Sequence, residues 1–276
     1  MYTAFDLEID FKDIKNYSEY ITYGVARIES LKEIEPELEN YILSDGIIDG
    51  SHLSDNWFKI LDSDIFISYS HNDRNLALAL TGWLTQTFKL KVFMDEIVWG
   101  GADALLKTID DKYCWQPESK TYNYSKRNLS TSHIHAMLSS AIYSVMDKTE
   151  VVIFLNTSNS VPNIESVMGE DTKYTLSPWI YQELTATQVL RVTEWSKYRE
   201  RTFLEHSQFS DKSSEMKIAY RLPNDNLTKI YASTLDKWKN NYESRNEQPY
   251  GNLFSKTFDH PLNYLYDIVL DRENKN

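Results

Sequence analysis

A tryptophan and a glutamate stand four residues apart behind a strong helix-start signal. Ser177 is a good N-cap, because its hydroxyl accepts a hydrogen bond from a free amide of a first helical turn, and Pro178 suits the first helical position. On such a helix Trp179 and Glu183 lie on one face, one turn apart. A carboxylate fixed in this way can stabilise a developing positive charge. The pair also fits a core tryptophan with a solvated glutamate, so the surrounding elements must decide between the two interpretations.

The composition is that of a globular, acidic chain. It has 276 residues, of which 41% are hydrophobic, and a net charge of −12. This length allows one large or two small domains, and the hydrophobic fraction is ample for a packed core. The negative charge argues against a general nucleic-acid binder, which needs a basic surface. The apolar runs are far too short to span a membrane, so we expect no membrane partner.

Cysteine usage and the first residues indicate a cytoplasmic protein. The single cysteine, Cys114, forms no internal disulfide and suits a reducing compartment. Residues 1–6 lack a basic region followed by an apolar stretch, so we expect no secretory signal. His133 and His135 would point to different faces of a helix, and we therefore expect no metal site.

A strand, a helix and a second strand follow one another in the second quarter of the chain. Residues 65–69 and 90–94 are short apolar runs typical of buried parallel strands, and Asp73 is placed to cap the helix between them. Apolar residues recur along that helix at Leu76, Leu80, Trp83, Leu84 and Phe88. In such βαβ units ligands collect at the carboxyl ends of the strands, here residues 68–73 and 95–101.

Known phosphate-binding motifs are absent from the sequence. No G-x-G-x-x-G follows the first strand, and no G-x-x-x-x-G-K-[ST] occurs anywhere, so the usual dinucleotide and P-loop sites are excluded.

The remaining segments suggest the organisation of the chain. We interpret residues 1–60 as a mainly helical, acidic extension that covers the neighbouring domain, and residues 112–131, which are polar and aromatic, as an insertion. Residues 151–155 predict a third buried strand and residues 217–222 a fourth. A final amphipathic helix is expected after Pro261. The pattern assigns no element to the rest of the last third.

Four segments together resemble the successive motifs of a TIR domain. They are DIFISYSHND at 64–73, VFMDE at 92–96, VVIFL at 151–155 and SPWIYQEL at 177–184. In order and spacing they are similar to bacterial TIR proteins of the antiphage type, including Thoeris-type sensors, and the likeness covers about residues 61–276. The resemblance implies an α/β, flavodoxin-like, doubly wound parallel sheet. The extension and the insertion depart from the minimal domain.

The resemblance implies an enzyme that takes NAD⁺ as its substrate and needs no cofactor. In TIR enzymes the glutamate of this helix is catalytic, and here it falls on Glu183, with the preceding aromatic position on Trp179. Cleavage of the nicotinamide–ribose bond builds positive charge on the ribose, which a fixed carboxylate can stabilise. Attack by water gives ADP-ribose, and attack by the substrate's own adenine or ribose gives a cyclic product. We expect a cyclic ADP-ribose-type signal that a downstream effector binds in antiphage defence.

Further residues lie where the family's nucleotide pocket opens. They are Phe66, Ser68, Tyr69, His71, Asp95 and Trp99. Phe66 suits the core equally well, and Asp95 either caps a turn or holds the pocket. Trp99 either stacks on a nucleotide or fixes its own loop.

Two aromatic segments have more than one interpretation. Tyr113, Trp115, Tyr122 and Tyr124 in the insertion suit either a lid or a loop packed on the surface, and with Trp99 and Trp179 the Trp115 ring is a candidate to hold adenine near the ribose. The apolar, glycine-hinged loop 97–101 predicts TIR–TIR contacts in a homo-oligomer.

Two other functions remain open. A non-enzymatic TIR adaptor would signal by assembly alone, and the presence of Glu183 with Trp179 favours the enzyme over it. An α/β nucleoside-processing transferase, such as a deoxyribosyltransferase, would act on nucleosides rather than on NAD⁺.

Overall fold

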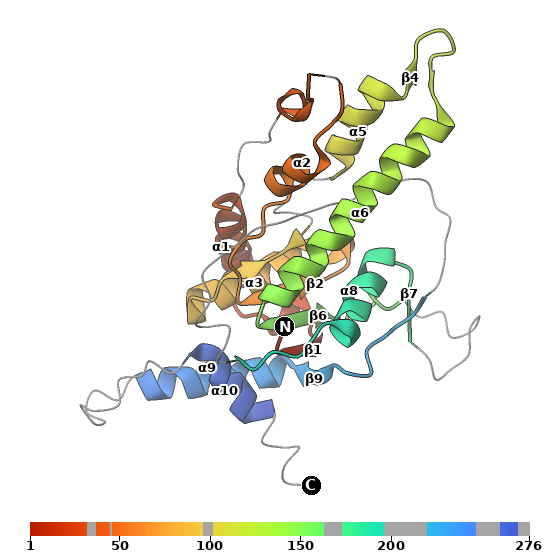
Figure 1. The fold of residues 1–276 in the computed structure, drawn as a ribbon. Coiled ribbons are helices and arrows are strands. Elements are labelled where there is room, and N and C mark those ends of the chain that lie inside the picture. Colours follow the sequence, from red (N-terminus) through yellow and green to blue (C-terminus); the bar gives the residue numbers. More distant parts are fainter. Residues whose placement is uncertain are drawn as a thin grey trace.

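The computed structural model describes most of the chain. It describes residues 1–31, 37–44, 46–95, 102–162, 173–195, 220–246 and 260–269. Within these ranges the architecture is α/β, as predicted, with helices arranged around a central sheet (Figure 1). No helix in the described ranges has the length and apolar character needed to cross a membrane.

Five parallel strands form the central sheet. They are β1 (Thr3–Glu8), β2 (Ile65–Ser68), β3 (Val92–Phe93), β6 (Val151–Leu155) and β9 (Thr228–Tyr231), in the order β3-β2-β6-β1-β9. Every residue of β2 and β6 is buried, which explains their unbroken apolar runs and confirms the strands predicted there. The parallel sheet is compatible with a flavodoxin-like fold.

The prediction of an extension over residues 1–60 needs correction. The segment is mainly helical, but β1 lies inside the central sheet and pairs with both β6 and β9. The strand was missed because Asp6 and Glu8 interrupt its apolar pattern, although Asp6 is only 1% exposed. The first residues of the chain are therefore an internal part of the α/β fold.

Helix α1 (Tyr17–Glu29) packs closely against α3 (Arg74–Phe88), the helix that joins β2 to β3. A Cβ atom added at Gly24 would lie 2.0 Å from the carbonyl oxygen of Leu78, and one added at Gly82 would lie 1.9 Å from that of Tyr20. Because only glycine leaves room for such contacts, the two backbones touch at these positions. Four shorter helical elements accompany them: η1 (Phe11–Asp13), η2 (Leu38–Tyr41), α2 (Gly50–Trp57) and η3 (His71–Asp73).

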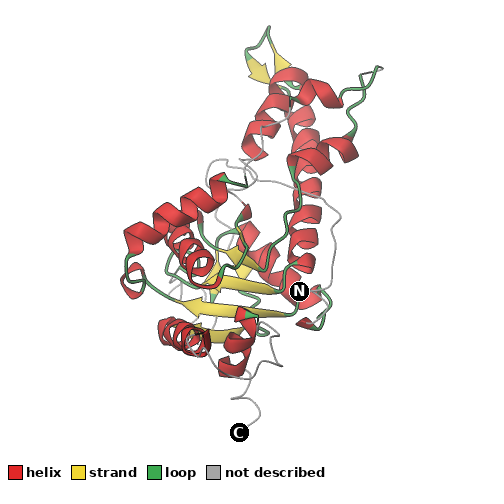
Figure 2. Cartoon of the chain, turned by 90° about the vertical axis from the view of Figure 1, so that its left-hand side faces the viewer, coloured by secondary structure: helices red, strands yellow, loops and turns green. Residues whose placement is uncertain are grey.

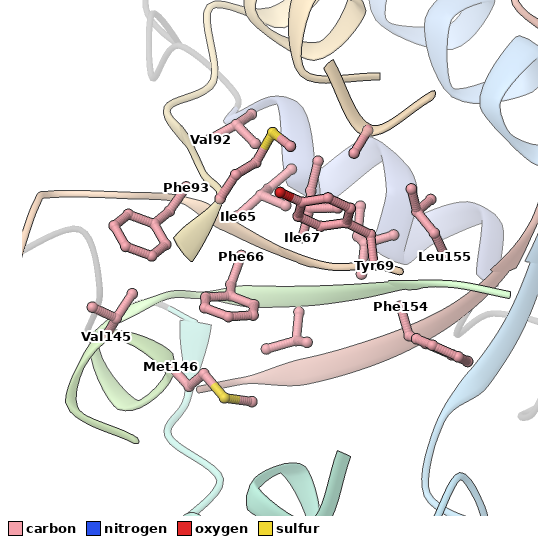
Figure 3. Packing of buried hydrophobic residues seen from close by; sticks show 14 of the residues in the cluster. Ile65, Phe66, Ile67, Tyr69, Val92, Phe93, Val145, Met146, Phe154 and Leu155 are labelled. Carbon is pink, nitrogen blue, oxygen red and sulfur yellow. The ribbon is translucent and has the colours of Figure 1, made fainter. Parts of the chain in front are cut away.

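The two faces of the sheet meet different helices. Phe66 of β2 lies on the same side as Met146 of α6 (Tyr124–Lys148), whereas Ile67 and Tyr69 lie on the other side (Figure 3). On that other side Met94 contacts Thr81 of α3, with 3.1 Å between sulfur and hydroxyl oxygen. We refer to the side of Phe66 as the α6 face and to the opposite side as the α3 face.

The predicted insertion at 112–131 is structured. It contains the end of α5 (Ala102–Tyr113), the antiparallel hairpin of β4 (Trp115–Gln116) and β5 (Thr121–Tyr122), and the first turns of α6. Helix α6 runs from the sheet out to this hairpin, which lies at the far end of the projecting helices (Figures 1 and 2). Lys112 of α5 joins Glu39 of η2 by an ion pair of 2.7 Å.

The C-terminal third differs from the prediction in one strand. Tyr220 and Arg221 form β8, which pairs antiparallel with β7 (Tyr174–Thr175) instead of entering the central sheet, and residues 217–219 lie outside the described ranges. The edge strand is β9, followed by α9 (Ala232–Asn246). The final helix, α10 (Pro261–Val269), is confirmed. Helix α9 is held by Trp238, which is fully buried and stacks on Phe88 with 4.1 Å between ring centroids.

Candidate functional site

Helix α8 (Pro178–Val189) begins where its sequence predicts. The Ser177 hydroxyl accepts a hydrogen bond of 3.2 Å from the amide of Ile180, and Pro178 is the first helical residue. Trp179 is half-buried and meets His135 of α6 edge to face, with 5.5 Å between ring centroids. The cap and this ring contact fix the first turn of α8 against α6.

Glu183 lies in the second turn of α8 and is buried. Its exposed fraction is 3%. The groups that act on its carboxyl are Ser68, the last residue of β2, and Asp95, the second residue after β3. Register pairs Phe66 with Phe93, and Ser68 and Asp95 each lie two residues further along the chain. Three distant segments thus meet at the carboxyl ends of β2 and β3.

The surroundings of Glu183 oppose its ionisation. Burial, and then the nearby Asp95 carboxylate, raise the pKa of Glu183 well above the ordinary glutamate value of 4.5. The Ser68 hydroxyl lowers that pKa, although the Ser68 oxygen makes no hydrogen bond of regular geometry. Ser68 is itself only 1% exposed. A buried hydroxyl therefore lies beside a buried carboxyl whose pKa is raised, and carboxyls perturbed in this way cluster at functional sites.

The other candidate residues are placed differently. Phe66 is fully buried and stacks on Phe93 at 5.8 Å between centroids, so of its two interpretations the core position is the one observed. Tyr69 is 8% exposed and lies on the α3 face, away from the side of Ser68 (Figure 3). His71 is exposed at the start of η3. Trp99 and the loop 97–101 lie outside the described residues.

The aromatic residues of the hairpin do not lie beside Glu183. Trp115 and Tyr122 meet edge to face at 5.0 Å, at the outer end of α6 (Figure 1). From Tyr124, where α6 begins, to His135 is about 16 Å along the helix axis. Trp115 is therefore not placed to hold a ligand against α8 in this structure, and the lid interpretation has no support here.

Two polar networks that the sequence analysis missed border the same end of the sheet. Asp6 of β1 accepts a hydrogen bond of 2.8 Å from the Asn156 amide, directly after β6. Asp73 accepts a hydrogen bond of 2.5 Å from the Thr157 hydroxyl and one of 2.7 Å from the Asn159 side-chain amide. The run of polar residues at 156–160, after a buried strand, is the signal that could have indicated these networks.

No group of three or more histidine, cysteine, aspartate or glutamate side chains in the described ranges is placed to hold a metal ion. Comparisons with protein-family models, with curated proteins and with solved structures gave no match.

Proposed function

We propose that this chain is a TIR-type enzyme that cleaves the nicotinamide–ribose bond of NAD⁺, with Glu183 as its catalytic carboxylate. The observation that supports this most is the burial of Glu183 at the carboxyl ends of β2 and β3, on a capped helix and beside Ser68 and Asp95. Parallel α/β sheets bind their ligands at this end. A glutamate buried there is positioned for electrostatic catalysis.

The chemistry needs the ionised form of Glu183. As nicotinamide leaves as a neutral molecule, positive charge develops on the ribose, and a carboxylate in a poorly solvated site stabilises it strongly. Burial and Asp95 raise the pKa of Glu183 in the unliganded protein and so favour its protonated form. The nicotinamide ring of NAD⁺ is cationic, and a positive charge beside a carboxyl favours loss of its proton to solvent. Substrate binding thus prepares the carboxylate that the reaction uses.

Ser68 and Trp179 support this role in the proposal. The Ser68 hydroxyl can donate a hydrogen bond to the Glu183 carboxylate once it forms, consistent with its effect on the Glu183 pKa. Trp179, one turn before Glu183, borders the site on the side of α6. Its half-buried ring offers a flat apolar surface to a substrate ring.

The wider part of the proposal rests on the resemblance of the four sequence segments. The enzyme would act in the cytoplasm as a homo-oligomer with TIR–TIR contacts. Its product, a cyclic ADP-ribose-type nucleotide or ADP-ribose, would be bound by a downstream effector in antiphage defence. If assembly is required, specific activity rises with protein concentration.

Chromatography with mass spectrometry tests the reaction directly. Purified protein is incubated with NAD⁺ in one arm and with a mixture of nucleosides and free bases in the other. We expect nicotinamide and a single adenine-containing product in the first arm, and the mass of that product distinguishes a cyclised from a hydrolysed nucleotide. Base exchange in the second arm alone would indicate a nucleoside transferase, and no product in either arm would favour a non-enzymatic adaptor.

A further inference from the structure

Two polar residues, Ser68 of β2 and Asp6 of β1, lie level on the α6 face on either side of β6. Register pairs Ser68 with Phe154 of β6, and Phe154 with Asp6 of β1, so these residues share one face. Asp95, which acts on Glu183, follows β3, and Asn156 lies two residues beyond Phe154, directly after β6. The chain leaves β2 for β3 on one side and returns to β6 on the other, which makes the β2–β6 boundary the switch point at which such sheets bind ligands.

Asn156, directly after β6, is held by hydrogen bonds to β1. Its backbone amide donates a hydrogen bond of 2.9 Å to the Leu7 carbonyl, and its side-chain nitrogen donates one of 2.8 Å to Asp6. The second oxygen of Asp6 lies 3.5 Å from the side-chain nitrogen of Asn224. Asp6 is 1% exposed, and a carboxylate accepts hydrogen bonds but donates none. The Asn156 side chain must therefore turn its nitrogen, and not its oxygen, toward Asp6. In the part of the chain that the structure describes, no other hydrogen bond engages the Asn156 side chain, which is half-buried, so its carbonyl oxygen and second N–H can meet a ligand.

We propose that the Asn156 amide, oriented by Asp6, is an adenine-binding site that reads the base of the dinucleotide substrate. This rests on the proposed cleavage of NAD⁺. One acceptor beside one donor on a fixed amide matches adenine, which presents its 6-amino donor beside a ring-nitrogen acceptor. Hypoxanthine carries a carbonyl oxygen in place of the amino group and offers two acceptors on its N7 edge, so the same amide does not match it there.

The position of Asn156 has a consequence for the product. Strand spacing and rise place its Cα roughly 8 Å from that of Ser68, which lies beside Glu183. An adenine bound at Asn156 is therefore held near the ribose from which nicotinamide departs. In the cyclising reaction an adenine nitrogen forms a bond to that ribose carbon as the bond to nicotinamide breaks, and the electron pair leaves with nicotinamide. Such positioning favours attack by adenine over attack by water.

Calorimetric titration with two dinucleotides tests the site without any turnover. The catalytically impaired Glu183→Gln protein is titrated with NAD⁺ and with nicotinamide hypoxanthine dinucleotide. We expect the dissociation constant of NAD⁺ to be lower than that of the hypoxanthine form by a factor of about ten or more. A second substitution, Asn156→Ala, made in the Glu183→Gln protein should remove the preference for NAD⁺. Asn159→Ala is the matched control, because that amide also donates to a buried carboxylate, Asp73, and it should leave the preference intact.

Two further results keep the test decisive. If Asn156→Ala does not fold, Asp6→Asn replaces it: an amide at position 6 no longer fixes the Asn156 orientation, so the preference should fall severalfold. Equal affinity for the two dinucleotides, no binding of either, or a preference unchanged by the Asn156 and Asp6 variants would overturn the adenine site. A preference for NAD⁺ in a protein that never releases nicotinamide would uphold the site and refute the proposed reaction.

Discussion

Glu183 carries a proton at a pH where an exposed glutamate has lost it, because burial and Asp95 raise its pKa. At pH values above 4.5, the ordinary pKa of glutamate, the folded state therefore binds more protons than the unfolded state. Stability from this group is complete below that pH and is lost as pH rises toward the raised pKa. Glutamine resembles the protonated carboxyl and does not titrate. We therefore predict that Glu183→Gln is more stable than wild type at pH 8, by on the order of 1–3 kcal/mol.

Urea unfolding between pH 4.5 and 8.5 measures this difference. The two proteins should have similar stability at the acid end and should diverge as pH rises. Glu118→Gln, at an exposed glutamate of the β4–β5 turn, is the control and should show no such divergence. If wild type is at least as stable as Glu183→Gln at pH 8, the pKa of Glu183 is not raised in the folded protein.

Asp95 sets part of the Glu183 pKa, and this gives a prediction for catalysis. Replacing Asp95 by asparagine removes a negative charge that disfavours ionisation of Glu183. The ionised form then appears at lower pH, so the acid limb of kcat/KM for nicotinamide release should move to lower pH. A pH–rate profile of Asp95→Asn beside wild type tests this. A limb that stays in place or moves to higher pH would show that Asp95 does not act on the catalytic carboxyl.

At the scale of residues, the sequence revealed what depends on neighbours in the chain. The cap at Ser177 follows from signals within one turn. Burial of Glu183 does not, because the same residues also suit a solvated glutamate. Burial of Asp6 depends on Asn156, which lies 150 residues away, so no local pattern indicates it. Phe66 suited two roles because a strand residue's neighbours on the sheet are set by tertiary packing.

At the scale of elements, the contact of α1 with α3 is the feature least visible in the sequence. A glycine inside a helix is unfavourable by itself, and at positions 24 and 82 it lets the two backbones touch. Each glycine is explained only when the partner helix is known. In contrast, β2, β3 and β6 could be predicted because their burial on both faces leaves an unbroken apolar run.

The α1–α3 contact yields a stability prediction. At Gly82 an added methyl group meets the carbonyl of Tyr20 at 1.9 Å, so the helices must separate. We predict that Gly82→Ala destabilises the fold by about 3 kcal/mol, at the upper end for overpacking. Gly50→Ala is the control, since its Cβ meets only the flexible end of Met137, at 3.1 Å. Thermal unfolding of both variants checks the prediction, and a Gly82→Ala protein as stable as wild type would disprove the close contact.

At the scale of the whole molecule, β1 makes the first sixty residues part of the fold. Removing them takes an internal strand from between β6 and β9 and leaves both without a partner on that side. It also uncovers α3, against which α1 packs. We predict that a fragment of residues 61–276 does not fold cooperatively, whereas the full chain does. Circular dichroism during urea unfolding compares the two, and a cooperative transition in the fragment would restore the interpretation of residues 1–60 as a separate extension.

The overall α/β class followed from the βαβ pattern of residues 65–94, but the strand order did not. Order depends on which strands meet across long connections, and β1 enters the sheet between strands that come much later in the chain. The β4–β5 hairpin shows the same limit, because its aromatic residues gave no indication that they lie far from α8 (Figure 1).

The most direct test of the central claim compares nicotinamide release from NAD⁺ by wild type and by Glu183→Gln, at equal protein concentration and with both proteins shown to be folded. We expect wild type to release nicotinamide at a measurable rate. The rate for Glu183→Gln should be lower by a factor on the order of 100 or more, because a charge-stabilising carboxylate is lost while the fold is kept. Release by Glu183→Gln within about threefold of wild type, or no release by wild type at any protein concentration, would contradict the claim.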